Sequence, residues 1–349
     1  MATPAIAIVG MGPRGISILE RLAARMDDSS SPVTVHLIDE AQHGAGRVWD
    51  TAQTKTLCMN TRAGAVTLFT EPGATVDAPV LEGPTQYEWI QLLRGEGNKV
   101  APAKRELYAQ HPPAPHIATE YRAELAATRP ESNPTRALYG EYLRWVYDAV
   151  LARLPESIST VSHHHRVETI TADGAADILH LDDGSQVRAD ATVLAYGWMA
   201  PRFNDEEQHL AESGLHWIAP GNPVEQDYKA IPAGEDVLVR GLGMGFYDIM
   251  ALTTIERGGK FVEDATTRSG LRYEASGKEP HFIVSSGRGY PFHPKSEYNE
   301  LPPTMPRRRL HGVIGKLKGA EDIDFDAQVW PAIARDSYEA YITTLERVN

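Results

Sequence analysis

The stretch that decides the fold is Ala5-Ile6-Ala7-Ile8-Val9 followed directly by Gly10-Met11-Gly12-Pro13-Arg14-Gly15. An unbroken apolar run of this length is typical of a strand that is buried on both faces. Gly-x-Gly-x-x-Gly directly after such a strand is the fingerprint of a dinucleotide-binding turn. The first glycine permits the tight turn, the second lets a pyrophosphate approach the backbone, and the third lets the helix and strand pack closely.

The residues that follow supply the rest of a β-α-β unit. Apolar residues recur at helical spacing from Ile16 to Met26, and a second apolar run, residues 33–38, ends at Asp39 and Glu40. An acid at that point can accept hydrogen bonds from a ribose diol, with Asp39 as the first candidate and Glu40 as the alternative. The helix N-terminus offers free N–H groups to phosphates. The unit is therefore predicted to bind a dinucleotide through Gly10, Gly12, Pro13, Gly15 and Asp39.

A second copy of the pattern begins at Asp236. Residues 236–240 read as a strand, and Gly241, Gly243 and Gly245 follow it. Phe246 occupies the third glycine position, because Gly245 comes one residue early. This turn is predicted to bind a second nucleotide, and a purely structural turn stays open as the alternative.

The strand after the second turn bears on which nicotinamide cofactor is used. Residues 281–284 read as a strand that opens into Ser285-Ser286-Gly287-Arg288, without Asp or Glu. An acid there favours the 2′-OH of NADH, whereas an arginine with small hydroxyl neighbours suits the 2′-phosphate of NADPH. Ser286 and Arg288 therefore predict NADPH, the alternative being that Arg288 caps a loop or pairs with a surface carboxylate.

Several of these features resemble a known group of proteins. The N-terminal Gly-x-Gly-Pro-x-Gly, the later Ala195-Tyr196-Gly197 and the second glycine turn resemble the flavoproteins with two dinucleotide-binding domains. More narrowly, the chain resembles a bacterial FAD/NAD(P)-binding family, which is similar in outline to the amine N-hydroxylases of siderophore pathways. The stretches that carry this resemblance are Gly44-Ala45-Gly46-Arg47-Val48-Trp49, Met59-Asn60-Thr61, Tyr139-Gly140-Glu141-Tyr142-Leu143 and Ser286-Gly287-Arg288-Gly289.

The resemblance implies roles for individual residues. It implies that the first glycine turn and Asp39 hold the ADP part of FAD, and that Arg47, Trp49 and Gly197 lie beside this cofactor. It implies that Met59 and Asn60 approach the isoalloxazine, although N-hydroxylases usually have glutamine where Asn60 stands. Val167 would meet the adenine through its backbone. Such proteins usually close the FAD domain with a late strand, whereas this chain ends in an apparent helix, which suggests a shortened form or a missing C-terminal partner segment.

Together the sequence predicts an α/β fold, in which a Rossmann-like FAD domain carries an inserted, second Rossmann-like NAD(P) domain. We expect the FAD domain over residues 1–215, with an irregular, helical excursion at 76–130. The NAD(P)-binding domain is expected at 216–320 and a terminal helical segment at 321–349. The expected activity is that of an FAD-dependent, NADPH-using oxidoreductase, a monooxygenase acting on a small amine or amino acid. A flavin oxidase or dehydrogenase without NADPH use, or a non-catalytic nucleotide-binding subunit, stays open.

Composition excludes other classes. The net charge of −13 argues against nucleic acid as a partner, and no apolar run is long enough to span a membrane. The single cysteine, Cys58, excludes an internal disulfide or a dithiol redox centre, and its apolar neighbours predict that it is buried. These features suggest a cytoplasmic protein with a small-molecule substrate. A homo-oligomer stays open.

Two histidine-containing stretches offer further candidate ligands or catalytic groups. His163-His164-His165 is predicted to bind no metal, because adjacent strand residues point to opposite faces. His293 and Lys295 could face the nicotinamide or the substrate, but the prolines around them favour a surface loop at least equally.

Overall fold

The computed structural model describes residues 3–76, 79–292 and 301–348. The chain divides into two compact units, Met1–Lys295 and Ser296–Asn349. The terminal helical segment expected from the sequence begins later, at residue 321. The division instead groups helix α9 (Arg308–Leu317) with α10 (Trp330–Val348) in the terminal unit.

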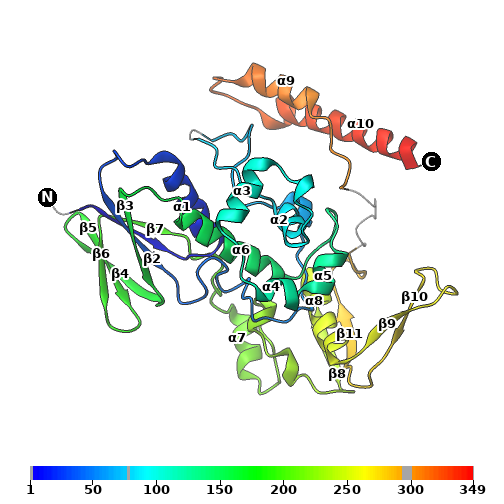
Figure 1. Cartoon of the computed structure of the whole chain (residues 1–349). Coiled ribbons are helices and arrows are strands. Elements are labelled where there is room, and N and C mark those ends of the chain that lie inside the picture. The colour runs from blue at the N-terminus through cyan, green and yellow to red at the C-terminus, as the bar shows by residue number, and fades with distance from the viewer. Residues whose placement is uncertain (1–2, 77–78, 293–300, 349) are drawn as a thin grey trace. The chain divides into compact units, whose positions relative to one another are not determined.

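The first glycine turn lies in a four-stranded parallel sheet of order β3-β2-β1-β7 (Figure 1). Its strands are β1 (Ala5–Val9), β2 (Val33–Ile38), β3 (Ile158–His163) and β7 (Ala191–Leu194). Ile8, Val35 and Leu37 are fully buried, as expected of parallel strands that are covered on both faces. The predicted α/β, Rossmann-like fold is confirmed.

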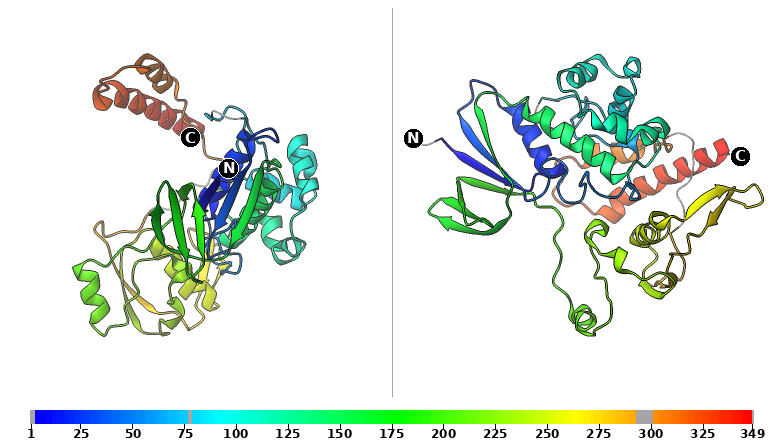
Figure 2. Two further views of the ribbon diagram at one scale, coloured as in Figure 1. Left: turned by 90° about the vertical axis from the view of Figure 1, so that its left-hand side faces the viewer. Right: turned by 60° about the horizontal axis from the view of Figure 1, so that its bottom comes forward.

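The two faces of this sheet have different covers, which Figure 2 shows from two sides. Helices α1 (Pro13–Arg25) and α6 (Arg136–Leu151) pack against each other on one face. On the other face lies an antiparallel sheet of β4 (Val167–Asp173), β5 (Ala176–Leu181) and β6 (Gln186–Ala189). The side chains of this sheet that face inward are Leu179, Leu181, Val187 and Ala189. They form a separate core with Ala7 and Ile38.

The segment between β2 and β3 is mainly helical. It contains α2 (Gln86–Leu93), α3 (Pro102–Gln110), α4 (His116–Glu120), α5 (Arg122–Ala127) and α6. Trp89, Tyr142 and Trp145 form a buried aromatic cluster between α2 and α6. The polar atoms of two of these rings are satisfied by backbone: the Tyr142 hydroxyl donates to the Pro84 carbonyl at 2.8 Å, and the Trp145 indole donates to the His111 carbonyl at 2.6 Å.

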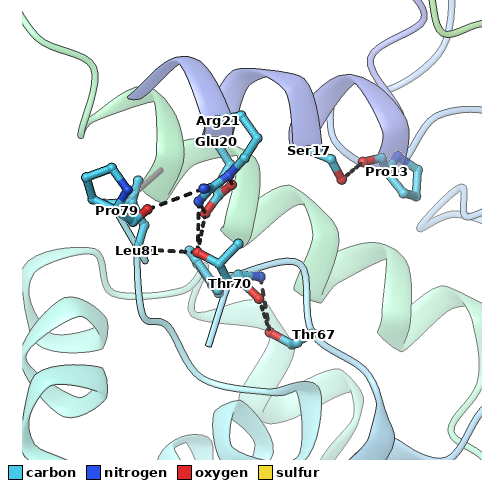
Figure 3. Close-up of polar contacts among 9 residues, drawn as sticks. Pro13, Ser17, Glu20, Arg21, Thr67, Thr70, Pro79 and Leu81 are labelled. Carbon is cyan, nitrogen blue, oxygen red and sulfur yellow. Dashed lines mark hydrogen bonds and ion pairs between the residues drawn. The ribbon is translucent and has the colours of Figure 1, made fainter. Parts of the chain in front are cut away.

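A buried carboxylate ties α1 to the extended chain that precedes α2 (Figure 3). Glu20 is almost fully buried and forms an ion pair with Arg21. The Thr70 hydroxyl donates to Glu20 Oε1 at 2.9 Å, and it accepts the Leu81 N–H at 2.9 Å. Hydrogen bonding to Glu20 raises the pKa of Arg21. The network satisfies a charge that would otherwise be costly to bury.

Replacing Glu20 by alanine is expected to destabilise the fold by about 2 kcal/mol, because Arg21 and the Thr70 hydroxyl each lose a charged partner. Urea unfolding followed by circular dichroism measures the change. Ser17→Ala, in the same helix, is the control, since it removes only an exposed bond to the Pro13 carbonyl. Equal stabilities of the two variants would contradict the prediction.

The second glycine turn lies in a smaller sheet within the same unit. Strands β8 (Asp236–Arg240) and β11 (His281–Ser285) pair in parallel, and α8 (Met244–Thr253) follows the turn. Strands β9 (Lys260–Glu263) and β10 (Leu271–Glu274) form an antiparallel hairpin between α8 and β11. Helix α7 (Asp205–Glu212) lies between β7 and β8 in the chain. Short 3-10 segments are Ala63–Ala65, Gly97–Lys99, Pro223–Glu225, Tyr228–Ala230 and Ile255–Arg257.

The terminal unit consists of α9, a π-helical turn at Phe325–Val329, and α10. Arg309 of α9 donates to the buried Asp336 of α10 at 2.9 Å and also pairs with Glu339. Among the described residues, none of the helices combines the length and the apolar character that a membrane crossing needs.

Candidate functional site

The first glycine turn is held tightly between two strand ends. Gly10 has a φ of +100°, and its N–H donates to the Ile38 carbonyl at 2.7 Å. A Cβ at Gly10 would lie 2.4 Å from the carbonyl oxygen of Ala195, and one at Gly15 would lie 2.3 Å from that of Gly10. These two positions therefore need glycine for the fold itself, whether or not a ligand binds.

Gly12 differs from both of them. It is the N-cap of α1 with an extended backbone, at φ −76° and ψ −162°, which any residue can adopt. A Cβ there would have Gly46 Cα, at 3.8 Å, as its nearest neighbour. The space in front of Gly12 is thus open, next to the free N–H groups of the first helical turn.

Gly12 opens into a cavity of about 600 Å³, which is in the size range of small-molecule and cofactor sites. Most residues that the sequence assigned to FAD line it: Gly10, Gly12, Pro13, Asp39, Glu40, Arg47, Trp49, Val167 and Gly197. Gly15 packs inside the turn behind it.

The acid at the end of β2 braces the turn as well as lining the cavity. One carboxylate oxygen of Asp39 accepts the Met11 N–H at 2.7 Å, and the other accepts the Ala41 N–H at 2.9 Å. Each oxygen keeps a lone pair for a further donor. Glu40 also lines the cavity, and its carboxylate lies 3.6 Å from Arg166. Both candidates for a ribose partner are therefore placed at the cavity wall.

Three arginines line the cavity together with the N-terminus of α1: Arg14, Arg47 and Arg166. Arg47 Nε lies 2.5 Å from Glu225, and its Nη2 donates to the Trp198 carbonyl at 3.0 Å. A helix N-terminus and several guanidinium groups around one space favour an anion with several oxygens, such as a pyrophosphate.

The end of β7 and the residues that follow it give the cavity an apolar wall that was not predicted from the sequence. These residues are Leu194, Tyr196, Trp198 and Met199, and all four side chains are exposed. Exposed apolar groups gathered at a cavity are typical of a surface that a ligand covers. Their signal in the sequence was their place at the carboxyl end of a parallel strand, where ligands bind in open α/β sheets.

Two residues that were expected to approach the isoalloxazine do not line the cavity. Met59 is buried in the main core and Asn60 is exposed, and neither is among the residues that line the cavity. The predicted burial of Cys58 is wrong, because its side chain is exposed. Leu57 and Met59 face the core, so Cys58 between them in an extended segment points the other way.

The second glycine turn repeats the first in its backbone geometry. The Gly241 φ is +114°, and the Gly241 N–H donates to the Ser285 carbonyl at 2.7 Å, as that of Gly10 does to Ile38. Gly243 is the N-cap of α8 at φ −89° and ψ −163°. A Cβ at Gly245 would meet no atom within 4 Å, and Phe246 instead packs against Phe282 of β11. Ser286 thus stands where Asp39 stands in the first unit.

Arg288 lies against Phe292, which in turn contacts the second glycine turn. The Arg288 guanidinium lies over the Phe292 ring, 4.3 Å from its centroid. The Phe292 N–H donates to the Leu242 carbonyl at 3.3 Å, and a Cβ at Gly243 would lie 3.2 Å from the ring. The Ser286 hydroxyl accepts the Gly289 N–H at 3.0 Å. His293 and Lys295 lie outside the described residues.

Within the described residues, one group brings three potential metal ligands together: His165, Asp182 and Asp183. The imidazole faces the two carboxylates with different nitrogens, Nδ1 at 2.9 Å from Asp182 and Nε2 at 3.4 Å from Asp183. One ion can use only one of these nitrogens, so the arrangement suits a histidine bridging two acids.

Comparison with known proteins agrees with this geometry. A family model described as FAD-NAD(P)-binding matches residues 7–199, which hold the first glycine turn and the whole cavity wall. The chain belongs to this family. The open Gly12, the helix N-terminus and the guanidinium groups fit the pyrophosphate of such a cofactor.

Curated relatives of this FAD-NAD(P)-binding chain are named as an L-aspartate N-monooxygenase and as a nitrosuccinic acid synthase. It is 36% identical over 354 residues to an L-aspartate N-monooxygenase (nitrosuccinate-forming) of Streptomyces cremeus, covering 97% of this chain and 51% of the relative. It is 34% identical over 359 residues to nitrosuccinic acid synthase of Aspergillus oryzae, covering 98% and 50%. The chain thus spans about half the length of these curated relatives.

Solved structures resemble it more distantly. A flavin-containing monooxygenase from Stenotrophomonas maltophilia is 16% identical with a TM-score of 0.36, over 81% of this chain and 58% of that one. This score is too low to support an argument about function.

Proposed function

We propose that this chain carries the FAD-binding and NADPH-binding parts of an N-monooxygenase that acts on a small amino acid. The observation that carries the proposal is the pair of equivalent glycine turns, the first of which opens on the cavity. The names of the curated relatives make L-aspartate the first substrate to test. The balanced reaction takes a primary amine, O₂, NADPH and a proton, and gives a hydroxylamine, water and NADP⁺.

In this proposal bound FAD would supply the redox chemistry between NADPH and O₂. The chain's own residues bind and orient the cofactors. The α1 N-terminus and Arg14, Arg47 and Arg166 would hold the pyrophosphate, and Asp39 or Glu40 would accept hydrogen bonds from the ribose. The apolar side chains after β7 would exclude water from the face of the bound cofactor.

The first experiment is an absorbance spectrum of the purified protein, followed by NADPH oxidation with and without L-aspartate. Bound flavin and aspartate-stimulated NADPH oxidation, with a hydroxylamine as product, are expected. Flavin that is bleached by substrate without NADPH use would instead support an oxidase or dehydrogenase. A colourless protein that cannot be reconstituted with FAD would favour a nucleotide-binding subunit.

The organisation that goes with this function is also a proposal. We assign FAD binding to residues 1–215 and nicotinamide nucleotide binding to the part that follows, which the sequence placed at 216–320. A cytoplasmic location fits the single cysteine, and fractionation of cells would test it. Size-exclusion chromatography with light scattering would decide between a monomer and a homo-oligomer.

Cofactor choice gives a sharper test, because Ser286, and not an acidic residue, occupies the position equivalent to Asp39. Arg288→Ala is expected to weaken NADPH binding about 10- to 100-fold while changing NADH binding little, since a charge-assisted bidentate pair with the 2′-phosphate is lost. Titration of each cofactor into the flavin-loaded protein measures this. Arg272→Ala, on the β9–β10 hairpin, is the matched control. Equal losses for the two cofactors would contradict the assignment.

A further inference from the structure

One guanidinium connects α8, the helix after the second glycine turn, to α6, which packs against the helix of the first glycine turn. Arg136, the first residue of α6, donates from Nη2 to Asp248 Oδ2 of α8 at 2.7 Å. The two side chains are only 12% and 19% exposed. Residues 112 positions apart in the chain therefore form a largely buried ion pair.

The same arginine also holds the chain segment that precedes Met59. Its Nε donates to the Cys58 carbonyl at 3.2 Å, and its backbone N–H donates to the Leu57 carbonyl at 2.8 Å. Thr135, just before it, is fixed by Glu124, whose carboxylate accepts both the Thr135 N–H at 2.7 Å and its hydroxyl at 3.0 Å. Arg136 is thus held by residues 57 and 58 as well as by its ion pair with Asp248.

Asp248 lies five residues after Gly243, about one and a half helical turns from the second glycine turn. The ion pair at Asp248 therefore restrains α8 and, through it, the turn at the start of α8. Burial raises the pKa of Asp248, while Arg136 acts in the opposite direction. A carboxylate in that setting needs its partner, because an unpaired buried charge is costly.

We propose that Arg136 and Asp248 are positioning residues, which hold the second nucleotide turn at the distance from the first cavity that hydride transfer requires. The inference rests on the proposed function, because it assumes a nicotinamide cofactor on α8 and FAD in the cavity. Neither residue lines the cavity. Reacting atoms must come within about 3.5 Å, and a misplacement of about 1 Å costs on the order of 100-fold in rate.

The test uses Asp248→Asn, which keeps the shape of the side chain and removes its charge. FAD occupancy is expected to stay at the wild-type level and the Kd for NADPH to change less than about 3-fold, while anaerobic flavin reduction at saturating NADPH slows about 10-fold or more. The swap variant with Arg136→Asp and Asp248→Arg should recover part of the rate, and Arg136→Lys should lie between. Arg240→Ala, which breaks the exposed pair with Glu206, is the control and should reduce flavin normally.

A second readout needs no cofactor turnover. Hydrogen–deuterium exchange of the α8 amides and of residues 57–59 should be faster in Asp248→Asn than in the wild type or in Arg240→Ala. Unchanged exchange and an unchanged reduction rate would overturn the inference, and so would a loss of FAD occupancy equal to the loss of rate. Wild-type protein that binds FAD but is not reduced by NADPH would instead overturn the proposed function. The exchange data would then still test whether the ion pair restrains α8.

Discussion

Gly12→Val is expected to abolish flavin retention while the protein still folds. The backbone of Gly12 is extended, so valine introduces no strain there, and the nearest atom to a Cβ is 3.8 Å away. The added methyl groups enter the cavity at the N-terminus of α1, where a pyrophosphate would lie. We expect a colourless protein, with stability lowered by about 1 kcal/mol because valine is a poor N-cap.

Absorbance at the flavin bands and thermal unfolding by circular dichroism measure both effects. The matched control is Gly243→Val at the second turn, which should retain FAD and lose NADPH binding. A Gly12→Val protein that purifies with full flavin would show that the cofactor does not approach this turn. Loss of flavin in both variants would show that the effect is not specific to the first turn.

Gly140→Ala is expected to destabilise the fold by about 3 kcal/mol, near the upper end for an overpacked site. Gly140 lies inside α6, where alanine would ordinarily stabilise a helix by up to about 1 kcal/mol. A Cβ here would lie 1.9 Å from the carbonyl oxygen of Trp49, and backbone cannot move aside as a flexible side chain can. The clash also pushes on the segment that carries Arg47 and Trp49 to the cavity, so weaker flavin binding should accompany it.

Gly312→Ala in α9 is the control, because it makes the same substitution inside a helix and meets no atom within 4 Å. It should leave the main unfolding transition unchanged. Urea unfolding and flavin titration of both variants measure the effects. A Gly140→Ala protein as stable as the wild type would mean that α6 and the Trp49 segment can separate at little cost.

Local patterns were sufficient for the parts of the fold that depend on neighbours in the chain. Apolar runs predicted β1, β2 and β8, and glycine turns follow β1 and β8, because buried parallel strands and tight turns leave direct marks on composition. The same holds for α6, in which the apolar residues Leu138, Tyr142 and Val146 recur at helical spacing. The exposure of Cys58 could not be predicted in this way, since an apolar run does not tell which side of an extended segment faces the core.

The cavity was predicted in part. Its glycines, Asp39 and Arg47 were assigned to the cofactor from the sequence, whereas Tyr196, Trp198 and Arg166 were not. They reach the cavity because parallel strands end at the same edge of a sheet, which brings segments from β2, β3 and β7 together. Which side chains meet there depends on strand order, and strand order is a long-range property.

The sequence by itself determined the fold class, the two glycine turns and the absence of an acid after β11, because each depends on a few consecutive residues. Only the tertiary structure decided that Gly12 faces open space while Gly10 and Gly15 do not, and that Ser286 is the counterpart of Asp39. It alone joined Arg136 to Asp248 across 112 residues. The physical reason is that a buried ion pair and a cavity wall are made by segments distant in the chain, and packing of the whole unit sets their distances.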